Sequence, residues 1–348
     1  METKKNTYVI LRLSSLGNVA MLVPVVTQLS LTYPDDEFVV MSLKPLGDLF
    51  YGLNNVRFVE VAPEVEHSHG LYRLFKQVKA LKPAKVFDLQ DDMRTRTVRY
   101  LLHWHNISTN TINLGNRERR ALSRAGYEAS TPLKPEVERY ADTFRGGGLQ
   151  PAGDVPLMPV NTKAAKQVQE LFGQKTERWI GIAPFAKHLS NVLPYKTMKD
   201  VIAYYAQQPD TRIFLFGAGH VETEMLRQWA SLWDNVESVT NQLPLDGELE
   251  LMRQIDGLLC MDSANQHLAA LVGCPTLSIW CGTHPYMGFA AWGRANTQIL
   301  SLPVSCRPCS IHGRDKCKYR NFACKALSPE LIVERFNRLL NSENKQTI

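Results

Sequence analysis

Apolar positions in the first half of the chain fall into short blocks separated by longer mixed stretches. The blocks are rich in β-branched residues and lack strict alternation with polar residues, which is typical of parallel strands buried on both faces. The intervening stretches are long enough for helical crossovers, so the pattern predicts a doubly wound domain. The expected strands are TYVILRL (7–13), EFVVMSL (37–43), RFVEVA (57–62), AKVFDLQ (84–90) and TINL (111–114).

A second series of blocks follows a stretch rich in glycine and proline, and we expect a linker at 150–165. We therefore predict an α/β protein of two Rossmann-like, doubly wound parallel-sheet domains, 1–160 and 161–348, facing each other across a cleft. Ligands of such sheets bind at the carboxyl ends of the strands. The second series is RWIGIAP (178–184), RIFLFG (212–217), NVESVT (235–240), GLLCMD (257–262) and PTLSIW (275–280), and LSPELIVERFNRLLNS (327–342) is expected to be a final helix.

Composition fits this architecture, because 348 residues with 44% apolar and 21% charged residues suit a globular protein of about two domains. The apolar stretch 19–31 is too interrupted to span a bilayer, and no cleavage site precedes it, which favours a cytoplasmic protein. The net charge is +6, with basic runs at 94–100 and 117–124. Such runs suit a phosphorylated acceptor, an anionic membrane surface or nucleic acid, or are simply solvated helix faces.

Three junctions between a strand and a helix are candidate phosphate sites, since a helix N-terminus presents free N–H groups. They are LRLSSLGNVAMLVP (11–24), FGAGHVETEM (216–225) and MDSANQHLAALVGCP (261–275). Each is also compatible with simple tight packing. No G-x-G-x-x-G turn follows the first strand, which argues against a nicotinamide dehydrogenase.

Taken together, these stretches resemble glycosyltransferase family 9, the heptosyltransferases of lipopolysaccharide core assembly. ILRLSSLGNVAMLVPVV is similar to the opening R-x-S-S/A-L-G-D-V of the family, and VFDLQDDMRTRTVRYL is similar to its D-L-Q segment with following basic residues. The longest match is MDSANQHLAALVGCPTLSIWCGTHP, which resembles the D-T/S-G-x-x-H-L-A-A stretch and the G-P-T-x-P that follows it.

The resemblance implies a GT-B fold whose N-terminal domain binds the acceptor and whose C-terminal domain binds a nucleotide-activated sugar, with the last helix packing back onto the first domain. It implies inverting transfer of heptose from an ADP-heptose-like donor to a lipopolysaccharide or related glycolipid, with no required cofactor and with peripheral contact at the inner membrane. The expected donor-binding residues are Lys187, Asn191, Glu222, Asp262, Ser263, Ala264 and His267. The expected acceptor-binding residues are Ser15, Gly17, Arg94, Arg96 and Arg120.

Within this expected donor set, Asp262 would bind sugar hydroxyls and Glu222 the ribose, while Ser263 and Ala264 would present N–H groups to the diphosphate. His267 has two interpretations, a donor contact or a helix residue bonded to a nearby carbonyl. Two positions depart from the family pattern, because Ala264 replaces a glycine and Asn191 replaces a lysine. Lys187, four residues earlier, is a candidate to reach the same phosphates.

A third departure concerns the catalytic base, because Asn18 stands where the family has aspartate. An amide cannot accept a proton at neutral pH, although it can orient a hydroxyl. Asp91 and Asp92 are candidates for a relocated base, and the alternative for both is helix N-capping. The function is therefore a transferase, or alternatively a nucleotide-sugar- or glycan-binding protein of the same fold that has lost its base.

Four cysteines lie close together in CRPCSIHGRDKCKYRNFAC. The spacing of Cys306, Cys309, Cys317 and Cys324 is compatible with structural zinc, with His312 as an alternative ligand. Reduced packing thiols and two disulfides are the other interpretations, and disulfides are disfavoured in a reducing cytoplasm. The segment is not accompanied by a surface on which basic residues alternate with aromatic residues, so we do not expect nucleic acid as a partner.

Overall fold

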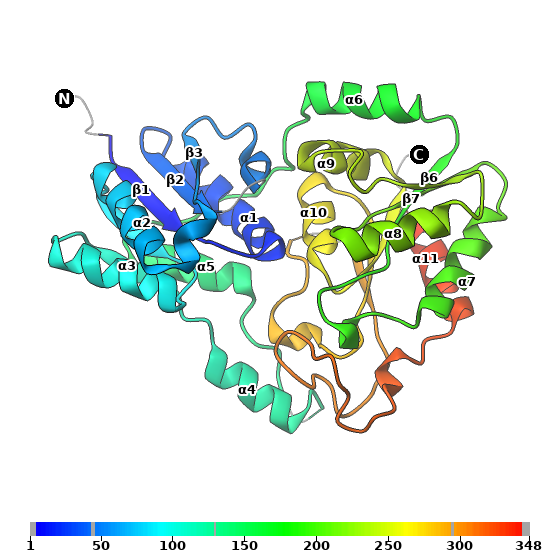
Figure 1. The fold of residues 1–348 in the computed structure, drawn as a ribbon. Helices are drawn as coiled ribbons and strands as arrows, with labels where there is room; N and C mark the ends of the chain where they lie inside the picture. Colours follow the sequence, from blue (N-terminus) through cyan, green and yellow to red (C-terminus); the bar gives the residue numbers. More distant parts are fainter. Residues whose placement is uncertain (1–4, 43–45, 129, 294–295, 343–348) are drawn as a thin grey trace. The chain divides into compact units, whose positions relative to one another are not determined.

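The computed structural model describes residues 5–42, 46–128, 130–293 and 296–342, and Figure 1 shows its elements. The chain divides into two compact units. The first comprises Met1–Asn116 and Lys134–Pro159, and the second comprises Arg117–Leu133 and Val160–Ile348. The division near residue 160 lies where the linker is expected. Residues 117–133, which the sequence analysis assigned to the first domain, group with the second unit instead.

Buried contacts explain why 117–133 belongs to the second unit. The Arg119 side chain is 2% exposed, donates to the Met287 carbonyl at 3.1 Å and lies over the Phe289 ring at 4.1 Å. The Tyr127 ring stacks on the His284 ring at 4.4 Å. These partners lie far away in the sequence, so the pattern along the chain does not reveal that the segment packs in the second unit.

The first unit is built on a parallel sheet in the order β3-β2-β1-β4-β5. All five predicted strands are present, although the last one, predicted at 111–114, lies earlier in the chain at Thr109–Thr111. Their bounds are β1 Thr7–Leu11, β2 Glu37–Ser42, β3 Val56–Glu60, β4 Lys85–Asp88 and β5 Thr109–Thr111.

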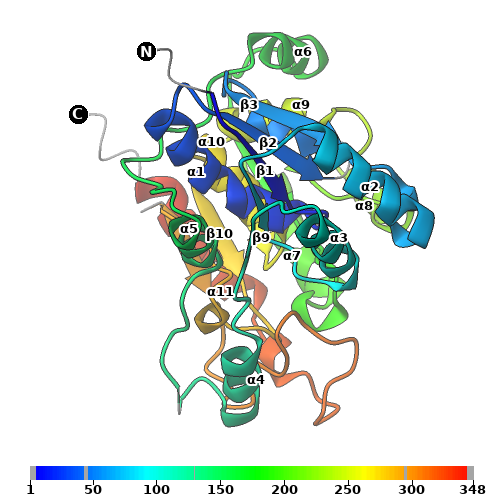
Figure 2. The ribbon, with the colours of Figure 1, turned by 90° about the vertical axis from the view of Figure 1, so that its left-hand side faces the viewer.

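Helices cover both faces of this sheet, as Figure 2 shows. On one face α1 (Leu16–Thr32) packs against α5 (Glu136–Gly146), and on the other α2 (Ser68–Ala80) packs against α3 (Met93–Trp104). Helix α1 is apolar around most of its circumference, because it is buried between the sheet and α5. Short 3-10 turns lie at η1 (Leu46–Phe50) and η2 (Pro63–Glu66).

The second unit has a parallel sheet in the order β11-β10-β9-β6-β7-β8. Counted within the unit, this is the 3-2-1-4-5-6 order of a complete Rossmann fold, so the doubly wound prediction is confirmed. The sequence analysis missed β11, an edge strand whose Thr and Gln dilute the apolar signal. The bounds are β6 Arg178–Ala183, β7 Thr211–Leu215, β8 Val236–Ser238, β9 Gly257–Met261, β10 Thr276–Ile279 and β11 Thr297–Leu300.

Two helical layers enclose this sheet. One contains α6 (Thr162–Phe172), α9 (Leu245–Gln254) and α10 (Ala264–Val272), and the other contains α7 (Tyr195–Ala206), α8 (His220–Ala230) and α11 (Pro329–Ser342). The remaining helical segments are α4 (Asn116–Ala125), η3 (Leu189–Asn191), η4 (Pro285–Met287) and η5 (Ala323–Lys325). No helix in the described part of the chain is long and apolar enough to cross a membrane.

The final helix packs within the second unit, where α11 contacts α7 and the strands β9, β10 and β11. Its expected packing onto the first domain stays a prediction. Ile332, Phe336 and Leu339 of α11 are each at most 1% exposed in the core of that unit. The apolar face of this helix is therefore satisfied within its own unit.

Strand order determines where ligands can bind. In the first sheet the order reverses between β1 and β4, and in the second it reverses between β6 and β9. At such a reversal the two flanking crossovers leave on opposite faces, which opens a crevice at the carboxyl ends of the strands. Each unit therefore carries its own switch point, and the predicted site residues can be compared with these two places.

Candidate functional site

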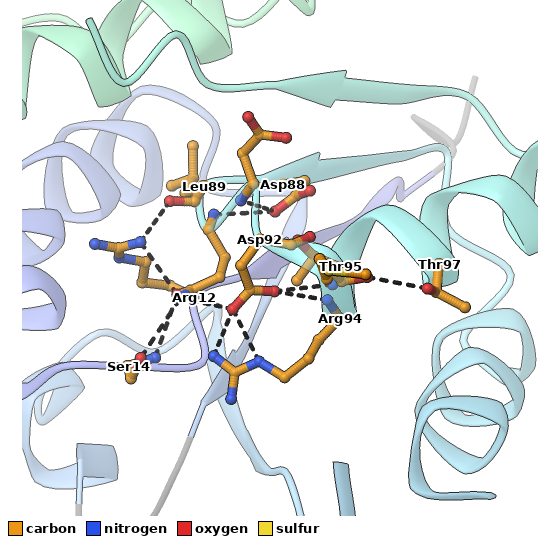
Figure 3. Close-up of polar contacts among 11 residues, drawn as sticks. Arg12, Ser14, Asp88, Leu89, Asp92, Arg94, Thr95 and Thr97 are labelled. Atoms are coloured by element: carbon orange, nitrogen blue, oxygen red, sulfur yellow. Dashed lines mark hydrogen bonds and ion pairs between the residues drawn. The ribbon is translucent and has the colours of Figure 1, made fainter. Parts of the chain in front are cut away.

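At the switch point of the first unit, the loops after β1 and β4 are tied together by a buried arginine. Arg12 is 4% exposed, and its Nη1 donates to the Leu89 carbonyl at 2.8 Å and to Gln90 Oε1 at 3.1 Å (Figure 3). The same Gln90 oxygen accepts the backbone N–H of Ser14 at 3.3 Å. The loop carrying the S-S-L-G-N motif is thus fixed against the D-L-Q segment.

Asn18 lies in the first turn of α1, directly after this loop. Its Nδ2 donates to Ser15 Oγ at 3.2 Å, and its carbonyl accepts the Tyr140 hydroxyl at 3.2 Å. Ser15, at the N-cap, is exposed and makes no side-chain capping bond, and Gly17 is partly exposed. The amide is therefore at a helix N-terminus beside the switch point, where it can orient a hydroxyl but not deprotonate it.

Asp92, one candidate for the relocated base, caps α3. Its Oδ1 accepts the backbone N–H groups of Arg94 at 2.9 Å and Thr95 at 3.2 Å, and its Oδ2 accepts Arg94 Nε at 2.8 Å (Figure 3). Burial raises the pKa of Asp92, but the bonds from Arg94 and Thr95 outweigh it and the net pKa is lowered. A carboxylate stabilised in this way is a weaker proton acceptor.

Asp91, the other candidate, is paired with two arginines. Its carboxylate contacts Arg96 Nε at 3.1 Å and Arg99 Nη2 at 2.8 Å, and its φ of 48° lies in the left-handed region. Arg99 also contacts the fully buried Asp88 at 2.8 Å, whose other oxygen accepts the N–H groups of Gln90 and Asp91. Burial raises the pKa of Asp88 despite these contacts. Asp88 therefore shapes the loop that positions both candidates.

The predicted acceptor-binding arginines are distributed over both units. Arg94 and Arg96 lie in the first turn of α3 and are ion-paired with Asp92 and Asp91. Arg120 is exposed on α4, and it belongs to the second unit rather than the first. The basic run of the first unit is thus partly neutralised, and on α4 Arg120 and Arg124 are exposed while Arg119 is buried.

At the switch point of the second unit, Asp262 ends the β9 segment and sits in a polar network. Its Oδ1 accepts Gln266 Nε2 at 3.1 Å, and its Oδ2 accepts the Thr283 hydroxyl and, at 3.4 Å, Asn191 Nδ2. Burial raises the pKa of Asp262 to about 6, although the bonds from Thr283 and Gln266 and the charge of Arg307 lower it. The carboxylate is therefore mostly ionised at pH 7 and surrounded by neutral donors.

Asn191, one of the predicted donor-binding residues, is built into this network. It is 3% exposed, its Nδ2 also donates to the His312 carbonyl at 3.1 Å, and its Oδ1 accepts the Ser190 hydroxyl at 3.1 Å. The predicted substitute Lys187 is exposed in the loop after β6. The amide thus contacts Asp262 directly, whereas Lys187 contributes an exposed positive charge on the same loop.

The start of α10 carries the other predicted donor contacts. Ser263 is the N-cap and Ala264 the first helical residue, and Ser263 makes no side-chain capping bond. Its hydroxyl accepts Asn265 Nδ2 at 3.4 Å. His267 is 7% exposed, and burial lowers its pKa to about 4, so its ring is neutral at pH 7. The first turn of α10 contains no acidic residue, so this helix N-terminus is suited to binding an anion.

Glu222 lies in the first turn of α8, after β7, the strand adjacent to β6. Its Oε2 accepts the backbone N–H of Ala218 at 3.0 Å. This bond closes the glycine-containing turn between β7 and α8 and holds the carboxylate at the carboxyl edge of the sheet. The placement is compatible with the predicted ribose contact, which stays a prediction.

The four cysteines line one pocket of the second unit, together with Arg307 and the end of α4. All are free thiols. Among the residues that the structure describes, no three histidine, cysteine, aspartate or glutamate side chains come together closely enough to hold a metal ion. The structural zinc that the spacing allows stays a prediction, with His312 outside the pocket lining.

With both switch points described, comparison with known proteins decides the family. The model of glycosyltransferase family 9 (heptosyltransferase) matches residues 73–319, more than half of the 348 residues. The chain belongs to glycosyltransferase family 9. No curated protein sequence matches this glycosyltransferase.

Solved structures with the same fold cover nearly the whole glycosyltransferase. The glycosyltransferase family 9 protein from Veillonella parvula DSM 2008 is 16% identical, with a TM-score of 0.76 and 98% of both chains covered. E. coli ADP-heptose lipopolysaccharide heptosyltransferase II is 16% identical, with a TM-score of 0.72, covering 97% of this chain and 99% of the other. E. coli heptosyltransferase WaaC with ADP-2-deoxy-2-fluoro heptose is 15% identical, with a TM-score of 0.63, covering 95% and 99%. These similarities confirm the GT-B architecture.

The sequence analysis of this glycosyltransferase missed residues that position the loops at the switch point of each unit. Arg12 and Gln90 link the loops of the first unit, and Thr283 and Gln266 contact Asp262 in the second. All four lie inside the motif stretches that carry the family resemblance. An i, i+4 relation between Asp262 and Gln266 was the one local signal available, while the other contacts join segments far apart in the chain.

Proposed function

We propose that this glycosyltransferase moves heptose from a nucleoside-diphosphate donor to a lipopolysaccharide core or related glycolipid, with inversion at the anomeric carbon. The observation that carries the proposal is the partly buried Asp262 network beside the start of α10, at the switch point of the second unit. An ionised carboxylate accepts hydrogen bonds from sugar hydroxyls, and the adjacent helix N-terminus accepts a diphosphate.

The donor residues divide the work in this proposal. Backbone N–H groups of Ser263 and Ala264 bind the diphosphate, Lys187 adds positive charge, and Glu222 accepts the ribose hydroxyls. These groups stabilise the charge that develops on the departing nucleoside diphosphate, because fixed dipoles and cations need no reorganisation during reaction. The similarity to E. coli ADP-heptose lipopolysaccharide heptosyltransferase II and to WaaC with ADP-2-deoxy-2-fluoro heptose supports ADP-heptose as the first donor to test.

The acceptor side rests on Asn18. Its amide orients the attacking hydroxyl, and the proton is taken by a carboxylate of the neighbouring loop, Asp91 or Asp92, once acceptor binding displaces an arginine partner. The alternative function is a nucleotide-sugar- or glycan-binding protein without turnover. It is favoured by the ion pairs of Asp91 and Asp92 with arginines, because a carboxylate held by an arginine is a weaker base.

Substitution at position 18 separates the two functions. Wild type, Asn18→Asp and the control Asn241→Asp, an exposed turn residue, are assayed for ADP release and for mass increase of a heptose-deficient lipopolysaccharide core. A transferase that works with asparagine shows turnover in wild type that Asn18→Asp changes by less than about tenfold. Donor binding without turnover in wild type, with transfer gained only in Asn18→Asp, would establish the binding protein.

Donor identity has its own assay. Thermal unfolding is measured with nucleoside diphosphates and their sugars, since a ligand at about 100 times its Kd stabilises a protein by roughly 2.7 kcal/mol. We expect selective stabilisation by ADP-heptose. Absence of stabilisation by every compound in the panel would count against the donor site and hence against the transferase. We further propose that the protein works in the cytoplasm at the inner-membrane surface, which membrane fractionation tests.

A further inference from the structure

A pocket of about 750 Å³ opens in the second unit, and none of the residues assigned above to the donor lines it. Its walls are the C-terminal end of α4 and the segment 304–324, with Ser190 and Gly282 between them. Every lining residue belongs to the second unit, including residues 123–126 at the end of α4. Neither the donor residues nor the motif at Asn18 account for this pocket.

The charge of the pocket has one sign. Arg124, Arg314 and Lys318 line it and are exposed, and among the described residues none of the three forms an ion pair. Arg307 adds a fourth cation that is 1% exposed. Among the described residues that line the pocket, none is an aspartate or a glutamate.

The hydrogen bonds of Arg307 go to carbonyl groups, and its charge also interacts with the Asp262 carboxylate. Its Nε and Nη2 donate to the Thr283 carbonyl at 3.1 and 2.8 Å, and its Nη1 donates to the Leu302 carbonyl at 2.7 Å. Carbonyl dipoles satisfy the donors but leave the unit charge in place, so the buried guanidinium contributes positive potential to the pocket. Burial lowers the pKa of Arg307, although arginine stays protonated in proteins.

Neutral hydrogen-bonding groups complete the lining of the pocket. Cys309 donates to the Gly282 carbonyl at 3.3 Å. The hydroxyl groups of Ser305 and Tyr319 add neutral hydrogen-bonding groups to the lining. Together these side chains suit an anion with several oxygens.

The pocket adjoins the Asp262 network along two segments of the chain. Ser190, which lines it, precedes Asn191, whose amide contacts Asp262 at 3.4 Å. Gly282, on the same wall, precedes Thr283, whose hydroxyl donates to Asp262. A ligand in the pocket is therefore separated from the proposed sugar-binding carboxylate by a single residue on each of these segments.

We propose that this pocket binds a phosphate monoester, and that the phosphate belongs to the sugar acceptor. Arginine forks bind phosphate oxygens bidentately and lysine adds a point charge, and a pocket without acidic side chains does not repel a dianion. Phosphate binding stands on the pocket alone, whereas its assignment to the acceptor rests on the proposed transfer reaction. The acceptor is then a phosphorylated glycan whose phosphate anchors it to the donor-binding unit.

The test is calorimetric titration of the full chain with glucose 6-phosphate, inorganic phosphate and glucose. It is performed in reducing buffer at constant ionic strength, with saturating ADP to occupy the donor site. The triple variant Arg124→Gln/Arg314→Gln/Lys318→Gln is compared with Lys163→Gln/Arg227→Gln/Arg335→Gln, which removes the same charge from exposed positions outside the pocket.

We expect glucose 6-phosphate to bind wild type and the control triple alike, and glucose not to bind. In the pocket triple, Kd should rise about tenfold or more, because charge-assisted hydrogen bonds to the phosphate are lost. Tighter binding of glucose 6-phosphate than of inorganic phosphate would support a sugar phosphate as the ligand. Equal affinity in the pocket triple and wild type, or no binding of either phosphate probe by wild type, would overturn the proposal.

ADP binding, measured in the same variants, separates this proposal from the proposed function. Loss of phosphate binding with unchanged ADP affinity supports the pocket as a second site. If wild type binds glucose 6-phosphate but not ADP, the donor assignment fails while phosphate binding in the pocket stands. If ADP affinity falls together with phosphate affinity in the pocket triple, the pocket is part of the donor site and the proposal of a separate acceptor site is refuted.

Discussion

Asp92 offers the sharpest test of how the first unit is used, because a cap and a base respond differently to the same substitutions. Its Oδ1 accepts two backbone N–H groups at the start of α3, and its Oδ2 accepts Arg94 Nε at 2.8 Å. Asp92→Ala removes both interactions. Losing an N-cap costs about 1 kcal/mol. Losing a partly exposed ion pair adds about 0.5 kcal/mol.

Asparagine separates the two roles, since it caps helices about as well as aspartate but carries no charge. We therefore expect Asp92→Asn to destabilise α3 by about 0.5 kcal/mol, the ion-pair contribution alone. Hydrogen exchange of the α3 amides measures this locally. A loss of about 1.5 kcal/mol in Asp92→Ala raises exchange by roughly tenfold where opening is local, and the asparagine variant should show about a twofold rise.

The pH dependence follows from the lowered pKa of Asp92. A carboxylate with a lowered pKa in the folded state contributes stability above its unfolded pKa, and that contribution is lost as pH falls through the folded value. The difference in exchange between wild type and Asp92→Ala should be full at pH 7 and should shrink below about pH 4. A fall in transfer of about a hundredfold or more in Asp92→Asn, with α3 protection as expected for that variant, would refute a role in capping alone and identify Asp92 as the base.

Further predictions concern the carboxylates of Asp88 and Asp262. Asp88→Asn breaks the contact with Arg99 and should destabilise the first unit by about 2–3 kcal/mol in urea unfolding. The control Asp142→Asn loses exposed pairs with Lys134 and Arg145 and should cost less than about 1 kcal/mol, and equal losses in the two variants would contradict the buried pair. Affinity for an ADP-sugar should fall by up to about tenfold per pH unit below about pH 6, where Asp262 becomes protonated, and should be weak and independent of pH in Asp262→Asn. Protonation of the Asp262 carboxylate also favours the fold, so the stability of wild type relative to Asp262→Asn should rise as pH falls from 7 toward 4, and a fall in this difference would reverse our assignment of the raised pKa.

Local patterns explain why the fold could be predicted in such detail. The strands of both sheets appear in the sequence as runs of buried β-branched residues, and parallel pairing follows from the crossover lengths. Two of the edge strands are the exception. Strand β5 is shifted and β11 was missed, because an edge strand packs against fewer neighbours and carries more polar residues.

Site residues were predictable only as far as their chemistry is local. The cap at Asp92 and the turns before α8 and α10 follow from short-range hydrogen bonds. The network around Asp262 does not, because Asn191 and Thr283 come from loops after β6 and β10. The sequence named Asn191 as a substitution for lysine, but its direct contact with the carboxylate appears only in the structure.

By itself, the sequence determined the two parallel sheets and the family, since these depend on periodicity and short motifs, and it predicted Asn18 at the position of the family base. The tertiary structure decided that the carboxylates of Asp91 and Asp92 are paired with arginines, that residues 117–133 join the second unit, and that four cations line the pocket at the cysteine segment, where no described lining residue is acidic. The physical reason is that ion pairing, burial and the sign of a pocket depend on side chains far apart in the chain, and only folding brings them within reach of one another.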